Sequence, residues 1–127
     1  MEAVVIVTAL ALIQFVVFGI QVSRIRGKSG IKAPTMTGSP ELDRMFRVHV
    51  NTMEQLVLFI PALWLYAYYV NPLWGAGIGL VYVIGRFIYR AAYLKDPSNR
   101  NLGFALSFLP SAVMLVWVLV VATISYF

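Results

Sequence analysis

The chain has 127 residues, of which 61% are hydrophobic and 12% are charged, and its formal net charge is +5. Soluble domains carry about 25% charged residues, so this composition argues against one. The sequence contains no cysteine and a single histidine, His49. This excludes disulfides, a catalytic cysteine and a metal site built from His and Cys, so any thiol must come from a bound substrate.

The charged residues are confined to parts of the chain. All ten Lys and Arg residues lie in two stretches, 24–47 and 86–100, whereas no charged side chain occurs in residues 3–23, 55–85 and 101–127. A membrane-spanning helix needs about 20 apolar residues. We therefore expect an all-α integral membrane protein, one domain over residues 1–127, whose transmembrane four-helix bundle has helices at about 3–23, 40–70, 73–94 and 102–126.

The first span and the loop after it are predicted from composition. Residues 1–23 are interpreted as a span rather than a cleaved signal peptide, because no basic residue precedes the apolar run. Residues 24–40 are rich in Gly, Ser, Thr, Pro and Lys, which predicts a loop. Ser39 followed by Pro40 is typical of a helix N-terminus, so the second helix should begin there.

Both basic stretches lie on the same side of the membrane, after the first and third spans. The positive-inside rule makes this side cytoplasmic, so both termini and the Asn71-Pro72 turn face the other way. Because the basic residues stand at helix ends, the positive charge indicates topology rather than nucleic-acid binding. We expect a multi-pass protein of a bacterial inner membrane rather than of the endoplasmic reticulum, surrounded by membrane lipids and forming oligomers.

The second helix carries polar residues in an apolar sequence. At about 100° per residue, Arg47, Asn51 and Glu54 fall within roughly 60° of one another. Ionisable groups at membrane depth usually face a bundle interior or a watery cavity, so we expect a functional site. The alternative is a structural network in which Glu54 pairs with Arg47 or Arg86 and Asn51 links two helices. Around the helix axis, His49 lies roughly 160° from Arg47 and Asn51. It can therefore reach their site only from another subunit.

The third helix carries polar and aromatic residues on one face. They follow the spacing i, i+4, i+7 and i+11: Tyr82, Arg86, Tyr89 and Tyr93. Residues 96–99 predict a turn, and Arg100 stands directly before the fourth helix. Tyrosines and basic residues are common near membrane surfaces, but the shared face with Arg86 favours a role for Tyr89 and Tyr93 in a site.

The segment Glu41–Glu54 resembles the signature of the MAPEG family, the membrane-associated proteins in eicosanoid and glutathione metabolism. Its core consists of an Arg, an Asn four residues later and a Glu three residues after that, which are Arg47, Asn51 and Glu54 in this chain. The similarity covers nearly the whole chain and includes Gly79–Arg86 of the third helix. It departs from the family's leukotriene-synthase members at Gln55, where they have Tyr, and at Arg26-Gly27, where they have two Arg residues, so we assign no subfamily.

The resemblance implies a homotrimer with three glutathione sites, each between neighbouring subunits and open to the cytoplasmic side. The family's glutathione-binding positions correspond to Arg47, Asn51, Glu54, Tyr89 and Tyr93, with Arg26 and His49 contributed by the adjacent subunit. Arg100 corresponds to the arginine proposed to activate the thiol, and no metal is implied.

The chemistry of these residue types suits glutathione, which carries two carboxylates and one ammonium: Arg side chains bind carboxylates and Glu54 binds an ammonium. We predict a membrane-embedded glutathione transferase that joins the thiolate to apolar electrophiles, with reduction of lipid hydroperoxides as a further activity. Two alternatives stay open. One is a glutathione-dependent isomerase or synthase with a single lipid substrate, and the other is a non-enzymatic lipid-binding scaffold.

Overall fold

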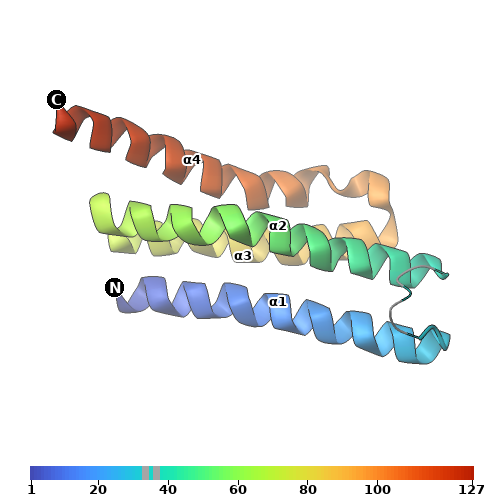
Figure 1. Cartoon of the computed structure of the whole chain (residues 1–127). Helices are drawn as coiled ribbons and strands as arrows, with labels where there is room; N and C mark the ends of the chain where they lie inside the picture. The colour runs from blue at the N-terminus through green and yellow to red at the C-terminus, as the bar shows by residue number, and fades with distance from the viewer. Residues whose placement is uncertain (33–34, 36–37) are drawn as a thin grey trace.

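The structure is a computed structural model that describes residues 1–32, 35 and 38–127, and in these residues four long helices form an up-and-down bundle (Figure 1). The helices and the 3-10 turn η1 are α1 (Glu2–Ser29), α2 (Pro40–Tyr69), α3 (Pro72–Lys95), η1 (Pro97–Asn99) and α4 (Asn101–Tyr126). All four helical segments are long and apolar enough to cross a membrane. The prediction of an all-α, four-span membrane protein is therefore confirmed.

The first helix is longer than predicted. α1 continues to Ser29, and its last turn contains Arg26, where the helix dipole favours a cation. It ends at Gly30, whose φ of 70° is a conformation that suits glycine. The prediction that a loop begins at the first basic residue was wrong, and Arg26 is helical. Residues 33–34 and 36–37 of the expected loop lie outside the described residues.

The starts of the next two helices follow from their capping residues. Ser39 Oγ accepts a hydrogen bond from the Leu42 amide at 3.0 Å, so it caps α2 as predicted. In the turn between α2 and α3, Asn71 Oδ1 accepts from the Trp74 amide at 3.0 Å. These caps satisfy amides that the first turn of a helix leaves without a backbone partner.

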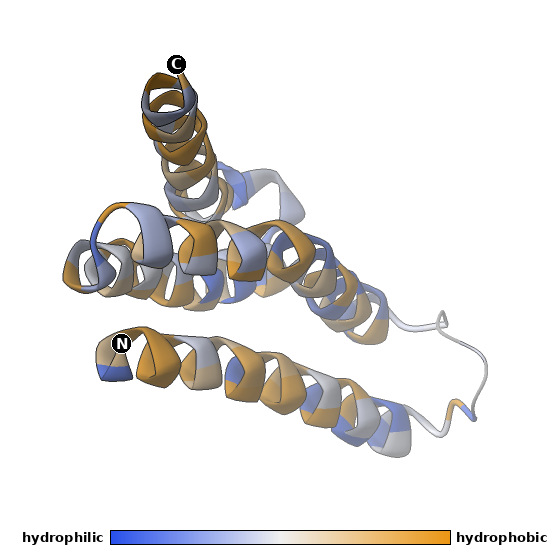
Figure 2. Ribbon diagram, turned by 60° about the vertical axis from the view of Figure 1, so that its left-hand side comes forward, coloured by the Kyte–Doolittle hydropathy of each residue, from blue (hydrophilic) through white to orange (hydrophobic). Residues whose placement is uncertain are grey.

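α1 and α4 lie on opposite sides of the central pair formed by α2 and α3 (Figure 1). The buried residues of α1 recur every three or four positions, as one face of a helix requires: Val4, Val7, Ala11, Gln14, Phe18 and Val22. Much of the remaining helix surface is exposed and apolar, which suits contact with lipid. Hydrophilic residues gather at the end of the bundle where α1 ends and α2 begins (Figure 2).

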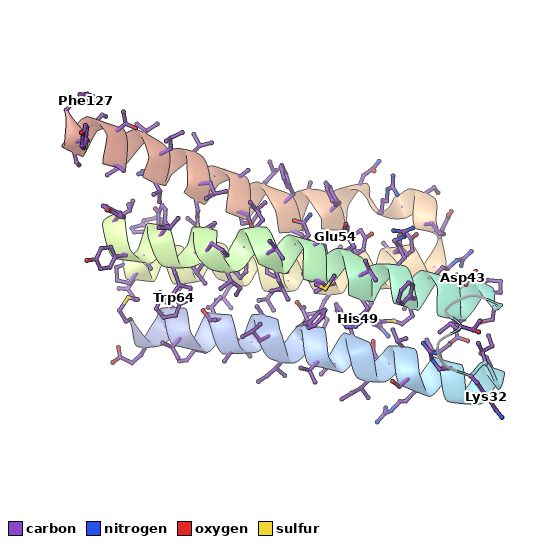
Figure 3. All side chains as sticks on the ribbon, in the orientation of Figure 1. Lys32, Asp43, His49, Glu54, Trp64 and Phe127 are labelled. Atoms are coloured by element: carbon purple, nitrogen blue, oxygen red, sulfur yellow. The ribbon has the colours of Figure 1, made fainter. Side chains whose placement is uncertain are left out.

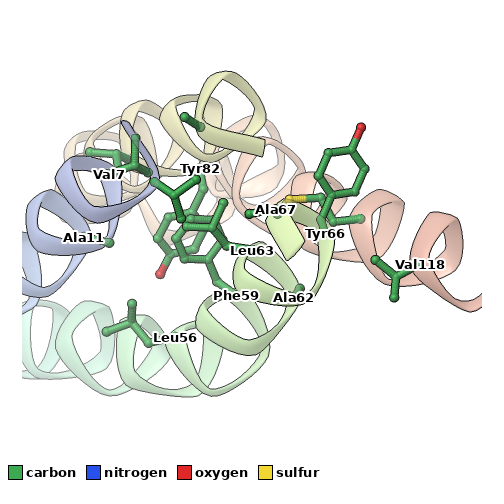
Figure 4. Close-up of a cluster of buried hydrophobic side chains, with 14 residues drawn as sticks. Val7, Ala11, Leu56, Phe59, Ala62, Leu63, Tyr66, Ala67, Tyr82 and Val118 are labelled. Atoms are coloured by element: carbon green, nitrogen blue, oxygen red, sulfur yellow. The ribbon is translucent and has the colours of Figure 1, made fainter. Parts of the chain in front are cut away.

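The apolar core joins all four helices. At its centre Phe59 of α2 and Tyr82 of α3 stack with ring centroids 3.9 Å apart (Figure 4). A second, smaller cluster lies nearer the hydrophilic end and includes Phe18, Val48 and Tyr89. This second cluster shares Tyr89 with the candidate site.

Candidate functional site

A fully buried arginine links the two central helices. Arg86 of α3 donates from Nη2 to Asn51 Oδ1 at 2.9 Å and to Thr52 Oγ1 at 3.0 Å, both on α2. Its Cζ lies 4.4 Å from the centre of the Tyr89 ring, which allows a cation–π interaction. The predicted polar face of the third helix therefore points into the bundle, and it consists of the buried residues Tyr82, Arg86 and Tyr89 with the half-buried Tyr93.

A cavity of about 420 Å³ opens beside this arginine, where α2, α3 and the start of α4 meet. Its lining residues are Asn51, Tyr89, Arg100, Asn101 and Phe104. This volume is within the range of roughly 300–1,000 Å³ that small-molecule sites usually have. The fold thus brings together three of the predicted site residues from three helical segments, and we call this space the α4 cavity.

A second cavity of about 500 Å³ lies nearer the hydrophilic end and contains two further predicted residues, Arg47 and Tyr93. Its other lining residues are Pro40, Asp43, Arg44, Phe46 and Pro97. The rings of Tyr89 and Tyr93 stack with centroids 5.5 Å apart, so the two cavities are neighbours across this pair. Five of the eight predicted residues therefore line one or the other of two neighbouring cavities, which are formed by α2, α3, the α3–α4 connection and the start of α4.

Arg100 is positioned by the turn before α4. Asp96 Oδ1 accepts from the Ser98 amide at 3.1 Å and so fixes the start of η1. This hydrogen bond holds the pKa of the Asp96 carboxyl below its usual range. Arg100 follows η1 as the N-cap residue of α4, with an exposed side chain. A cation here also lies near the positive end of the α4 dipole, which makes this a region of positive potential.

His49 lies on a different side of α2 from the cavities. Its ring stacks on Phe15 of α1 with centroids 4.5 Å apart, and a Cβ on Gly19 would lie 3.1 Å from His49 Nε2. Figure 3 shows His49 between α2 and α1, with Glu54 on the opposite side of α2. This agrees with the helical angle that separates His49 from Asn51. Arg26, in the last turn of α1, is likewise absent from the lining of both cavities.

Glu54 is exposed on α2 and lines neither cavity. Within the described residues it forms no ion pair with Arg47 or Arg86, so that part of the structural-network alternative was wrong for a single chain. The other part is seen, because Asn51 does link two helices through Arg86. Glu54 is thus an exposed carboxylate on a helix that is long and apolar enough to cross a membrane.

Several residues of the site were not predicted from the sequence. Thr52 donates to the Val48 carbonyl at 2.7 Å while accepting from Arg86, and its place one residue after Asn51 was the available signal. Arg86 was identified on the polar face but not as the centre of the network. Asn101 and Phe104 line the α4 cavity, and nothing in their local sequence distinguishes them from other residues of α4.

The chain is similar in sequence to known proteins. The sequence model of the MAPEG family matches residues 4–120. The chain is 40% identical over 111 residues to an uncharacterized protein of Synechocystis sp., covering 87% of this chain and 81% of the relative. It is 39% identical to human microsomal glutathione S-transferase 2 over 90 residues, 71% of this chain and 61% of the relative.

Leukotriene C4 synthase of Cavia porcellus is 34% identical over 94 residues, which are 74% of this chain and 63% of that protein. The chain thus spans somewhat less than two thirds of the two relatives that are named as enzymes. The match of the family model covers α2 and α3 fully and most of α1 and α4, and so includes the parts of the chain that line the cavities. The chain therefore belongs to the MAPEG family.

Proposed function

We propose that the protein is a membrane-embedded glutathione transferase that joins the glutathione thiolate to apolar electrophiles. The observation that carries this proposal is the α4 cavity, where Asn51, Tyr89 and Arg100 meet beside the buried guanidinium of Arg86. Similarity to a microsomal glutathione S-transferase supports the choice of thiol. The outward-facing apolar surface of the helices supports delivery of an apolar electrophile through the bilayer.

The proposed binding mode matches charges of opposite sign. Glutathione has two carboxylates and one ammonium, and we assign Arg47 to a carboxylate and Glu54 to the ammonium. Tyr89 and Tyr93 supply ring surface and hydroxyl groups along the wall that joins the two cavities. Arg100 is assigned to the sulfur, because a cation stabilises a thiolate relative to a thiol.

We further propose that the working protein is a homotrimer with each site between two subunits. Glu54 supports this, because a charged side chain exposed to lipid is costly and usually faces protein or a watery cavity instead. Arg26 and His49 support it as well, since both lie away from the cavities of their own chain. In this arrangement a neighbour supplies them to the site.

The proposed orientation places the hydrophilic end of the bundle on the cytoplasmic side, so that both cavities open toward the cytoplasm, and both termini on the other side. The Lys and Arg residues of 24–47 and 86–100 support this orientation through the positive-inside rule. Similarity to a cyanobacterial protein supports a bacterial membrane. Reporter fusions should place residues 24–46 and 95–101 in the cytoplasm and both termini outside, and a cytoplasmic C-terminus would contradict the orientation.

Two measurements on the detergent-purified protein test the function. The first is thermal unfolding titrated with glutathione, with S-hexylglutathione and a peptide lacking the thiol as comparisons, because a ligand that binds only the folded state raises Tm. The second is conjugation of glutathione to an aryl halide. Stabilisation with conjugation supports the transferase. Binding without conjugation points to a lipid isomerase or synthase, and absence of both points to a scaffold.

A further inference from the structure

The orientation of the Asn51 side chain is determined by its partner. A guanidinium group has only N–H donors, so the atom of Asn51 that lies 2.9 Å from Arg86 Nη2 must be the carboxamide oxygen, Oδ1. The amide nitrogen, Nδ2, has no hydrogen-bond partner among the described residues. Because Asn51 also lines the α4 cavity, its two N–H donors are the part of the carboxamide available to a ligand.

The arginine that orients Asn51 is itself held in place. One Nη2 hydrogen goes to Asn51 and the other to Thr52 Oγ1, whose own hydrogen is donated to the Val48 carbonyl at 2.7 Å. The Tyr89 ring covers the guanidinium at 4.4 Å. Each hydrogen bond in this series can therefore run in only one direction. If the Asn51 carboxamide rotated by half a turn, its NH2 group would face Arg86, and one donor of Arg86 would lose its acceptor.

The charge of Arg86 adds to this effect. The side chain is fully buried, no carboxylate in the described part of the chain pairs with it, and its Nε and Nη1 atoms have no hydrogen-bond partner there. A buried charge without a partner is costly, and its field extends into the adjoining cavity, which Arg100 also lines. The α4 cavity therefore combines positive potential with donors and suits an acceptor oxygen of an anionic ligand.

We infer that Arg86 is a positioning residue that turns Asn51 into a hydrogen-bond donor toward a carboxylate or carbonyl oxygen of the thiol substrate. This inference rests on the proposed glutathione site. It makes a distinctive prediction about Asn51→Asp, which has nearly the same shape as the parent. The new carboxylate still accepts from Arg86 and supplies the missing counter-charge, but it offers no donor to the cavity.

The experiment measures glutathione affinity by calorimetry, thermal unfolding without ligand, and KM and kcat for conjugation of an aryl halide. It uses five proteins: the parent, Asn51→Asp, Arg86→Lys, the double variant of these two, and Arg90→Lys. Asn51→Asp should keep or raise the Tm and should bind glutathione about 10- to 150-fold more weakly, the range for a lost charge-assisted hydrogen bond. Arg86→Lys keeps the charge but loses the paired geometry, so KM should rise more than kcat falls.

Arg90→Lys is the matched control. Arg90 lies on the same helix and donates from Nε to Gln21 Oε1 at 2.7 Å, and it lines neither cavity. Its replacement should leave affinity unchanged. The double variant Asn51→Asp with Arg86→Lys should bind no more weakly than the weaker single variant, because Arg86 is proposed to act through Asn51.

Three results would overturn the inference. Affinity of Asn51→Asp equal to the parent would mean that the carboxamide oxygen, not the nitrogen, faces the ligand. Additive losses in the double variant would mean that Arg86 acts independently of Asn51. Failure of the parent itself to bind glutathione would overturn the proposed function together with this inference, whereas the first two results leave the proposed function intact.

Discussion

Gly103 of α4 lies directly against the backbone of Tyr89 on α3. A Cβ built on Gly103 would be 2.4 Å from both the amide nitrogen and the Cα of Tyr89. Real Cβ atoms do not approach backbone atoms so closely, so only glycine permits this contact. The Gly103–Tyr89 contact determines how closely the start of α4 approaches α3. Arg100 lies about one helical turn before Gly103 and lines the same cavity as Tyr89.

Replacing this glycine should therefore disturb both the fold and the site. In Gly103→Ala the two helices must separate, and overpacking of this kind costs about 1–3 kcal/mol. We expect a lower Tm in detergent and weaker glutathione binding. Gly77→Ala is the control, because a Cβ at Gly77 meets nothing within 4 Å and alanine favours a helix by about 1 kcal/mol. A Gly103→Ala protein as stable as Gly77→Ala would contradict the close packing.

Helical periodicity predicted much of the fold and part of the site, because it reports which residues share a face. Arg47 and Asn51 were predicted together in this way, and both line cavities on the same side of α2. The end of α1 was not predicted, since basic residues suit the last turn of a helix as well as a loop.

The remaining features depend on contacts between helices that are distant in sequence. The link from Arg86 to Thr52 and the approach of Gly103 to Tyr89 join residues on different helices. A single sequence contains the residues but not their distances. Contacts between copies of the chain, proposed for Glu54 and His49, lie beyond any argument from one helix face.

Glutathione affinity should depend on the charged residues of α2. We predict that Arg47→Ala or Glu54→Ala weakens binding by about 1.5–3 kcal/mol, because each removes a charge-assisted hydrogen bond to the ligand. Calorimetry on detergent-purified protein measures this, with size-exclusion chromatography to check assembly. Parent-like affinity in folded variants would assign both residues a structural role instead.

His49 should act on the site of a neighbouring subunit. In a cyclic trimer that mixes Arg47→Ala and His49→Ala subunits, a shared site is intact wherever an unmodified Arg47 meets an unmodified His49 across an interface. Co-expressed and doubly tag-purified mixed trimers should therefore regain conjugation activity that both variant homotrimers lack. If each site used residues of one chain only, every site would carry a substitution, and activity would equal the weighted sum of the homotrimers.

The turn before α4 should make stability depend on pH. The hydrogen bond from the Ser98 amide lowers the pKa of Asp96 in the folded protein. Asp96 therefore stabilises the fold above its unfolded pKa of about 3.9, and this contribution is lost as the pH falls through the folded value. Asp96→Ala should lower Tm more at pH 7 than at strongly acidic pH, where the protonated carboxyl is a weaker acceptor.

Asp96→Asn serves as the control for that experiment, because the amide oxygen can still cap the turn without a titrating group. Its Tm at pH 7 should lie between those of Asp96→Ala and the parent, and no acid-dependent loss should come from residue 96. A Tm difference between Asp96→Ala and the parent that persists unchanged far below pH 4 would show that the carboxylate charge is not involved.

Arg100 should affect the chemical step more than binding. A free thiol has a pKa of about 8.5, so glutathione at neutral pH is mostly protonated unless the site favours the thiolate. Arg100 lies at the start of α4, where the helix dipole adds to its charge. If this cation contacts the sulfur, its loss removes about 1.5–3 kcal/mol of interaction with the charged form only. The pKa of the bound thiol should then rise by about one to two pH units in Arg100→Ala.

The ultraviolet absorbance of the thiolate against pH measures this change, and pre-steady-state conjugation of an aryl halide measures the chemical step. The rate constant of that step should fall in Arg100→Ala while affinity changes less, since the interaction is made mainly with the reactive form. Arg100→Lys should recover part of both effects, because lysine restores the charge but not the planar fork. If Arg100→Ala leaves the titration and the rate intact, Arg100 acts only as a topology signal. Thiol activation must then come from the hydroxyl of Tyr93 or Ser98, or from main-chain amides at the start of α4, which donate to an anion without a formal charge.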